Sequence, residues 1–120
     1  MNNVILIKHP KNWGLDEVMV LRVAEKALKS FGYPRGVELS ILFVGREKAK
    51  KYNMEYRKKN YIPQVLGFPM SKEPMADGRI RLGDIVICTE KLKYEVVFQK
   101  SRLEKVLLEW LKHGVNNLVI

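Results

Sequence analysis

Two apolar segments, residues 37–44 and 80–87, constrain the fold of this 120-residue chain more than any other feature. Residues 37–44 (VELSILFV) begin with alternating polar and apolar side chains and then become uniformly apolar, which is typical of a buried β-strand. Residues 65–68 and 80–87 are also predicted to be strands, and a loop that contains proline and glycine separates them. Residues 4–7 form a shorter apolar strand candidate. The sequence therefore predicts a small β-sheet.

Apolar residues elsewhere recur at helical spacing or alternate with basic residues. Helices are expected at residues 15–31, 46–57, 92–98 and 101–118. Ser101 is a suitable N-cap for the last of them, with Glu104 at the capping-box position. A chain of 120 residues has the usual size of one domain. We therefore expect one α+β domain over residues 1–120, with a small mixed β-sheet and helices packed mainly on one face.

The last predicted helix carries an apolar stripe and, at its margin, a row of polar side chains. The stripe consists of Leu103, Val106, Leu107, Trp110, Leu111, Gly114 and Leu118. Glu109, His113 and Asn117 follow one another at intervals of four residues, the spacing at which two side chains can bind one metal ion. His113 is a good ligand, Glu109 is plausible and Asn117 is poor, so this row does not make a catalytic zinc site. A histidine in this position is more often structural. Gly114 within the helix predicts a close approach by another segment.

Positive charge is the strongest compositional clue. Lysine and arginine number 22 against 13 aspartate and glutamate residues, a formal net charge of +9 that favours nucleic acid as a partner. A solvated surface that keeps the protein soluble is the alternative. Cations and tyrosines alternate within residues 46–61, and this pattern suits phosphate neutralisation and base stacking. The residues predicted to bind RNA are Lys48, Lys51, Tyr56, Lys58 and Lys59.

The expected environment is the cytoplasm. Cys88 is the single cysteine, so an internal disulfide is excluded. No apolar run is long enough to cross a bilayer, and the N-terminal residues do not have the pattern of a signal peptide. Within the predicted strand 80–87, Asp84 needs a partner if it is buried, and a basic residue of segment 48–59 can supply it.

Several motifs together resemble those of the YbeY family, bacterial factors of ribosomal-RNA maturation described as metal-dependent endoribonucleases for single strands. The similarity covers roughly residues 37–118 and starts with the strand 37–44. It continues through Asn53-x-x-Tyr56-Arg57, Lys59, Val65-Leu-x-Phe68-Pro69, Leu82-Gly-Asp-Ile-Val-Ile87 and His113-Gly114. The resemblance implies that Arg57 lies at the active site. It also implies a groove between the basic helix that contains Arg57 and the terminal helix that contains His113.

The departures from the family pattern concern its zinc site. Three histidines hold the metal in the family, and only the first has a counterpart here, His113. Asn117 occupies the second position, and the third would follow Ile120. Pro63 and Gln64 replace a Thr-Asp pair, and Gly67 replaces a serine. We therefore expect no tightly bound zinc and no other cofactor.

Three explanations of these departures remain open. The protein binds RNA or a ribosomal protein and assists ribosome assembly without cutting. Alternatively, it cleaves RNA without a bound metal, with Arg57 stabilising charge and His113 acting as acid or base. Finally, the natural chain extends past Ile120 and carries further ligands there, although Asn117 would still be a poor one. The expected partner is single-stranded or ribosomal RNA, and the choice between an endoribonuclease and a non-catalytic binding module is left open.

Overall fold

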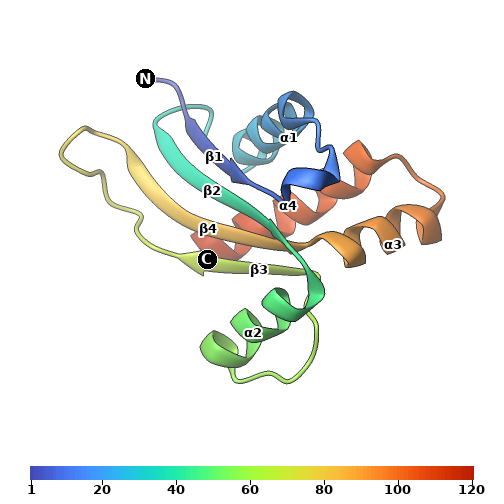
Figure 1. The fold of residues 1–120 in the computed structure, drawn as a ribbon. Coiled ribbons are helices and arrows are strands. Elements are labelled where there is room, and N and C mark those ends of the chain that lie inside the picture. Colours follow the sequence, from blue (N-terminus) through green and yellow to red (C-terminus); the bar gives the residue numbers. More distant parts are fainter.

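The protein, described here by a computed structural model of all residues 1–120, is built on one four-stranded sheet. The strands are β1 (Val4–Lys8), β2 (Val37–Val44), β3 (Val65–Pro69) and β4 (Ile80–Cys88). They are ordered β1-β2-β4-β3, with β1, β2 and β4 parallel and β3 antiparallel at the edge beside β4 (Figure 1). The predicted mixed sheet is therefore confirmed.

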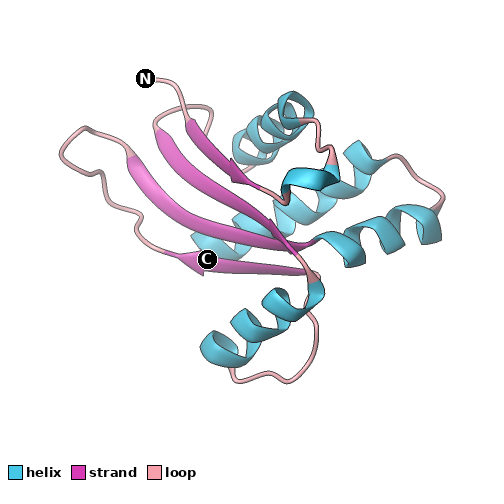
Figure 2. Ribbon diagram, viewed as in Figure 1, coloured by secondary structure: helices cyan, strands magenta, loops and turns pink.

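Helices cover mainly one face of this sheet, as predicted. The helices are η1 (Lys11–Trp13), α1 (Glu17–Ser30), α2 (Arg46–Arg57), α3 (Thr89–Gln99) and α4 (Leu103–Val119). In the view of Figure 2, α1 and α4 lie behind the strands, α2 lies below the edge strand, and no helix stands in front of the sheet. The other face is therefore mostly open, and α2 packs against one end of it through a smaller core of Val44, Ala49, Leu66, Val86 and Cys88. None of the helices combines the length and apolar character that a membrane span requires.

The main core lies between the sheet and helices α1 and α4. Every second side chain of β2 and β4 points into it, and the helices contribute their apolar stripes. Among its fully buried members are Val20, Leu28, Leu39, Ile41, Ile85, Ile87, Leu107 and Leu111. Helix α4 approaches the sheet closely at Gly114, where an added Cβ would lie 2.8 Å from Cγ2 of Ile85. This close approach was predicted from the glycine, and it fixes the depth at which α4 sits on the sheet.

The predicted capping box at the start of α4 is wrong. The N-cap is Arg102, and no side chain caps the helix. Instead, the Ser101 hydroxyl donates to the Gln99 carbonyl at 3.4 Å. The Glu104 carboxylate accepts from the Arg22 guanidinium of α1 at 2.7 Å. A charge-assisted bond between two helices replaces the local capping bond, because the tertiary fold brings a cation within reach of this carboxylate.

The Arg22–Glu104 pair predicts a pH-dependent contribution to stability. The hydrogen bond from Arg22, with the positive charges of Arg22, Lys26 and Arg102, holds the pKa of the Glu104 carboxyl below its ordinary value of 4.5. Because the pKa is lower in the folded than in the unfolded state, the pair stabilises the fold above pH 4.5. This stabilisation is lost as the pH falls through the folded pKa. Glu104→Gln is therefore expected to unfold at lower denaturant concentration than wild type near neutral pH, and to match wild type in acid well below 4.5.

The control for this prediction is Glu73→Gln, which removes an exposed carboxylate that takes part in no salt bridge. Its denaturation midpoint is expected to stay close to that of wild type at both pH values. A difference between Glu104→Gln and wild type that is equally large in acid and at neutral pH would contradict the assignment.

Candidate active site

A pocket of ≈ 570 Å³ opens between the C-terminal end of α2, the start of β3 and the middle of α4. Its walls are formed by Arg57, Tyr61, Ile62, Pro63, Gln64, Val65, Glu109, Trp110 and His113. Arg57 and His113 therefore share one pocket, although they are far apart in the sequence. Their side chains are exposed, so both are accessible to a large ligand. Their catalytic roles stay predictions, which the pocket makes sterically feasible.

Asn53 positions Arg57 at the edge of this pocket. It is a fully buried polar residue of α2, and its side-chain amide donates to the Tyr61 carbonyl at 3.0 Å. The Oδ1 atom of Asn53 accepts from Nη1 of Arg57 at 3.3 Å, and the same nitrogen reaches the Tyr61 hydroxyl at 3.3 Å. Asn53 thus ties the loop after α2 to the helix and holds one corner of the guanidinium. The Nε and Nη2 donors of Arg57 have no protein acceptor and are free for an anion.

Helix α4 supplies the opposite wall. Glu109 and His113 lie one turn apart on its exposed side, and Trp110, which is 8% exposed, fills the wall between them. No hydrogen bond or salt bridge to another protein group engages the His113 ring, so both of its nitrogens are available to a ligand. Because Gly114 is pressed against β4, the neighbouring His113 is carried on a rigid part of the helix.

The donors around His113 do not fit a catalytic zinc centre. Such a centre takes three protein ligands and a water, and no group of three histidine, cysteine, aspartate or glutamate side chains in residues 1–120 is placed to hold a metal. Asn117, at the second ligand position of the family, does not line the pocket. It packs against β3, where a Cβ on Gly67 would lie 3.0 Å from the Cβ of Asn117. Gly67 and Asn117, which both depart from the family pattern, therefore lie next to each other. The absence of bound zinc stays a prediction.

The residues predicted to bind RNA lie outside this pocket. Lys48 and Lys51 line a shallow depression on α2, and Lys51 contacts Glu55 at 3.9 Å. Tyr56 lines a separate pocket on the open sheet face. Lys58 and Lys59 follow the last residue of α2, and Lys58 adopts a left-handed conformation (φ 56°) that ends the helix. All five side chains are exposed. None of them lines the pocket of Arg57 and His113.

Several pocket residues were not predicted as site residues. Segment 61–64 forms one wall, and Tyr61 contributes both its hydroxyl and its carbonyl to the network around Arg57. Pro63 and Gln64 had been noted only as departures from the family pattern. Trp110 was assigned to the core, where it is mostly buried, but its edge also lines the pocket. The buried Asn53, one turn before Arg57, is the signal that identifies this loop, because a buried amide requires hydrogen-bond partners.

Comparison with known sequences identifies relatives over most of the chain. The family described as Endoribonuclease YbeY matches residues 11–119. A protein of that name from Acinetobacter baumannii is 32% identical over 109 residues, covering 88% of this chain and 68% of the relative. Those from Mesoplasma florum and Acetivibrio thermocellus are 30% and 34% identical, covering 91% and 83% of this chain. The alignments span 64% and 72% of the length of these two relatives.

The fold is also similar to a solved structure. The solution structure of TM1509 from Thermotoga maritima superimposes with a TM-score of 0.62 at 21% sequence identity. The alignment covers 96% of this chain and 71% of that chain. This likeness supports the architecture, whereas the sequence relatives carry the information on function.

Proposed function

The chain belongs to the Endoribonuclease YbeY family, and from this membership we propose that it cleaves single-stranded ribosomal RNA during ribosome maturation. The membership confirms the resemblance predicted from the sequence. Endoribonuclease is the name that the relatives carry. The ribosomal substrate and the cytoplasmic location are part of the proposal, and the single buried thiol of Cys88 supports a reducing compartment.

The observation that carries the proposal is the shared pocket of Arg57 and His113. A guanidinium with unoccupied donors can hold a phosphate through two parallel hydrogen bonds. An imidazole that faces the same space can move a proton to or from a nearby hydroxyl. The net charge of +9 attracts a polyanion to this surface. Together these groups can stabilise charge on a phosphodiester and move the proton that its cleavage involves.

The proposed reaction uses the ribose of the substrate as nucleophile. Arg57 holds the non-bridging oxygens of the scissile phosphate and stabilises the negative charge that develops on them. His113 takes the proton of the 2′-hydroxyl, whose oxygen then attacks the phosphorus. The bond from phosphorus to the 5′-oxygen breaks, and the leaving oxygen takes a proton from water. The hydroxide that remains takes the proton held by His113, which restores the neutral imidazole. The products carry a 2′,3′-cyclic phosphate and a 5′-hydroxyl. No step is assigned to zinc, because the donors present do not fit one.

The competing function is RNA or ribosomal-protein binding without cleavage. The lysines of α2 that lie outside the pocket favour it, since they can neutralise phosphates whether or not the chemistry occurs. Cleavage and RNA binding without cleavage both predict an RNA affinity that weakens with salt, with a slope of about −0.7 per phosphate neutralised for a single strand. Only cleavage separates them.

The deciding experiment incubates the protein with an end-labelled single-stranded ribosomal-RNA fragment, with and without chelator. We expect cleavage that survives the chelator and leaves 2′,3′-cyclic phosphate ends, because the proposed chemistry needs no metal. His113→Ala should lose this cleavage by about two to four orders of magnitude, the usual contribution of a general acid or base.

Lys112→Ala, prepared in parallel, is the control for contaminating nucleases and for the loss of charge on α4. Lys112 is exposed and does not line the pocket. Equal cleavage by all three proteins would identify a contaminant. RNA that is bound but intact with every sample would overturn the enzymatic proposal and leave the binding module.

A further inference from the structure

A second pocket lies on the face of the sheet opposite α1 and α4, between the exposed part of that face and helix α2. We name this space of ≈ 310 Å³ the aromatic pocket, and its walls are Leu42, Tyr52, Tyr56, Phe68, Asp84 and Val86. The proposed reaction uses none of these residues. The pocket therefore requires an explanation of its own.

Three aromatic rings form the wall of the aromatic pocket. The ring centroids of Tyr56 and Phe68 are 5.2 Å apart at an interplanar angle of 65°. Tyr52 lies 6.1 Å from Phe68 and 6.2 Å from Tyr56, so each ring supports the other two. Tyr56 nevertheless remains 63% exposed, which leaves much of its surface free. Such a ring, held in place by two neighbours, is a platform on which a planar ligand can stack.

Asp84 places a carboxylate at the floor of this aromatic pocket. It lies in the middle of β4, in register with Ser40 of β2 and Phe68 of β3. The side chain is half-buried, yet it takes part in no salt bridge and no side-chain hydrogen bond. The sequence-based expectation that a lysine or arginine of residues 48–59 pairs with it is therefore wrong. A half-buried carboxylate without a partner is matched to a ligand that donates hydrogen bonds.

The surroundings indicate which kind of ligand carries these donors. The adjacent depression on α2 shares Tyr52 with the aromatic pocket, and its charges balance, because Glu47 and Glu55 line it together with Lys48 and Lys51. Lys58 and Lys59, which follow Tyr56 by two and three residues, are exposed and take part in no salt bridge. They favour an anionic ligand and oppose a cationic side chain of a partner protein. Asp84 itself repels phosphate and so faces the uncharged part of the ligand. A nucleotide meets both conditions, because its phosphate can pair with the lysines while its base fills the pocket.

We propose that the aromatic pocket binds an unpaired guanine of the RNA, with its ring on Tyr56 and its Watson–Crick edge on the Asp84 carboxylate. The N1–H and N2–H groups of guanine donate side by side, which matches the two oxygens of a carboxylate. Uracil carries no amino group and fits less well. This assignment rests on the proposed function, since it names a base that the RNA substrate contains.

The aromatic pocket adjoins the candidate active site through α2. Tyr56 lines the aromatic pocket and the next residue, Arg57, lines the active-site pocket. Strand β3 connects them in the same way, with Val65 in the active-site pocket and Phe68 in the aromatic pocket. An RNA strand that crosses this edge of the sheet would place a base in one pocket and a nearby phosphate in the other. The aromatic pocket thus selects which phosphate reaches Arg57.

The test compares the affinity of short fluorescent oligouridylates with a central uridine, guanosine or inosine. Inosine keeps the purine ring and N1–H but lacks the 2-amino group, so it separates stacking from recognition by Asp84. We expect the guanosine RNA to bind about tenfold more tightly than the uridine RNA, with inosine between them. Asp84→Asn should abolish the advantage of guanosine over inosine, and Tyr56→Ala should weaken both purine RNAs. Tyr56 is exposed, so its variant is expected to fold.

Asp77→Asn is the matched control, because Asp77 is an exposed carboxylate of the β3–β4 loop outside the aromatic pocket. It removes the same charge, so it should strengthen all three RNAs alike and leave their ratios unchanged. Equal affinity for the three RNAs in wild type would overturn the guanine site while leaving RNA binding intact. No binding of any RNA would overturn the proposed function as well. Binding of an oligoarginine peptide that depends on Asp84, without a base preference, would instead assign the pocket to a basic protein.

Discussion

Arg57→Ala is expected to slow RNA cleavage by about 10²–10³-fold, the usual cost of removing one donor that stabilises a developing oxyanion. The donors Nε and Nη2 of Arg57 face the pocket without protein acceptors, so their loss removes contacts to the phosphate. Arg57→Lys should be intermediate, because an ammonium keeps the charge but cannot present two parallel donors. Single-turnover cleavage of end-labelled RNA measures both variants, and the Kd for intact RNA should change far less than the rate constant.

The stability of the Arg57 variants must be measured beside their activity. Arg57 donates to Oδ1 of the buried Asn53, so alanine leaves that acceptor without its partner at a cost of about 1–3 kcal/mol. Arg35→Ala is the matched control, since Arg35 is exposed, forms no salt bridge and lies outside the active-site pocket. A folded Arg57→Ala protein that cleaves RNA at the wild-type rate would exclude Arg57 from catalysis. An equal loss of cleavage rate in Arg35→Ala would show that the loss in Arg57→Ala comes from the lower net charge and not from a contact between Arg57 and the phosphate.

The regular elements were predicted well because their signals are local. The range of β2 matches the predicted residues 37–44, because alternation followed by an apolar run does not have the periodicity of a helix. Helix α2 matches residues 46–57 for a related reason, because the glycine before it and the change from apolar to basic residues mark its start. Helix α3 is longer than the predicted 92–98 and begins at Thr89. Its weak amphipathic pattern gave no clear boundary.

The candidate site was predictable only in part, because its geometry depends on the tertiary fold. Periodicity places His113 at the margin of α4, but it cannot show that Arg57 lies opposite. That proximity comes from the order of the strands, which puts β3 at the edge, and from the contact of Gly114 with β4. The resemblance to the YbeY family supplied this proximity, because it implied a groove between the helix that contains Arg57 and the helix that contains His113. The aromatic pocket escaped prediction for the same reason, since β3 and β4 meet at Asp84 only after the sheet has formed.

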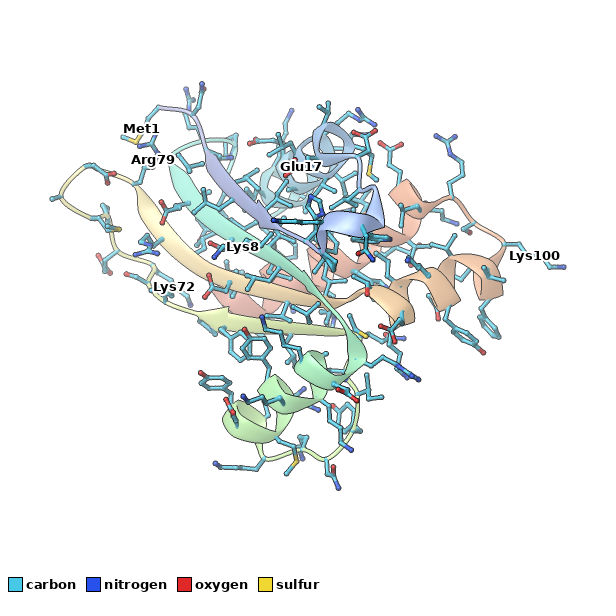
Figure 3. All side chains as sticks on the ribbon, viewed as in Figure 1. Met1, Lys8, Glu17, Lys72, Arg79 and Lys100 are labelled. Carbon is cyan, nitrogen blue, oxygen red and sulfur yellow. The ribbon has the colours of Figure 1, made fainter.

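Distant surface regions also show how the fold brings separate segments together. In Figure 3, Met1 and Arg79 lie close to each other at one end of the sheet, and Lys100 lies at the opposite edge of the molecule. The Arg79 side chain donates to the Asn2 carbonyl at 3.3 Å, which fastens the loop before β4 to the N-terminal segment. This contact has no local sequence signal, because its partners are distant in the chain. It ties the segment before β4 to the N-terminus, and β4 carries Asp84 and contacts Gly114.

Gly83→Ala is expected to destabilise the fold by more than about 3 kcal/mol, the largest loss of stability for any single methyl group added to this chain. Gly83 has a φ of 138°, and its ideal Cβ would lie 2.2 Å from the carbonyl oxygen of Phe68. That oxygen belongs to the backbone of β3 and cannot move aside without breaking the pairing of β3 with β4. The register of β2 against β4 also shifts next to Gly83, so neighbouring residues are already displaced. Denaturant unfolding followed by circular dichroism measures the change.

Gly32→Ala separates the two causes of this loss. Gly32 also has a positive φ, 86°, but an added Cβ would meet no atom within 4 Å. It should therefore cost only the backbone strain, about 1–2 kcal/mol. If Gly83→Ala costs no more than Gly32→Ala, the close packing of β3 on β4 described here is incorrect. If it costs much more, the close antiparallel pairing at Gly83 and Pro69 is what holds β3 at the edge. Loss of this pairing should then also weaken RNA cleavage, because β3 contributes Val65 to the active-site pocket and Phe68 to the aromatic pocket.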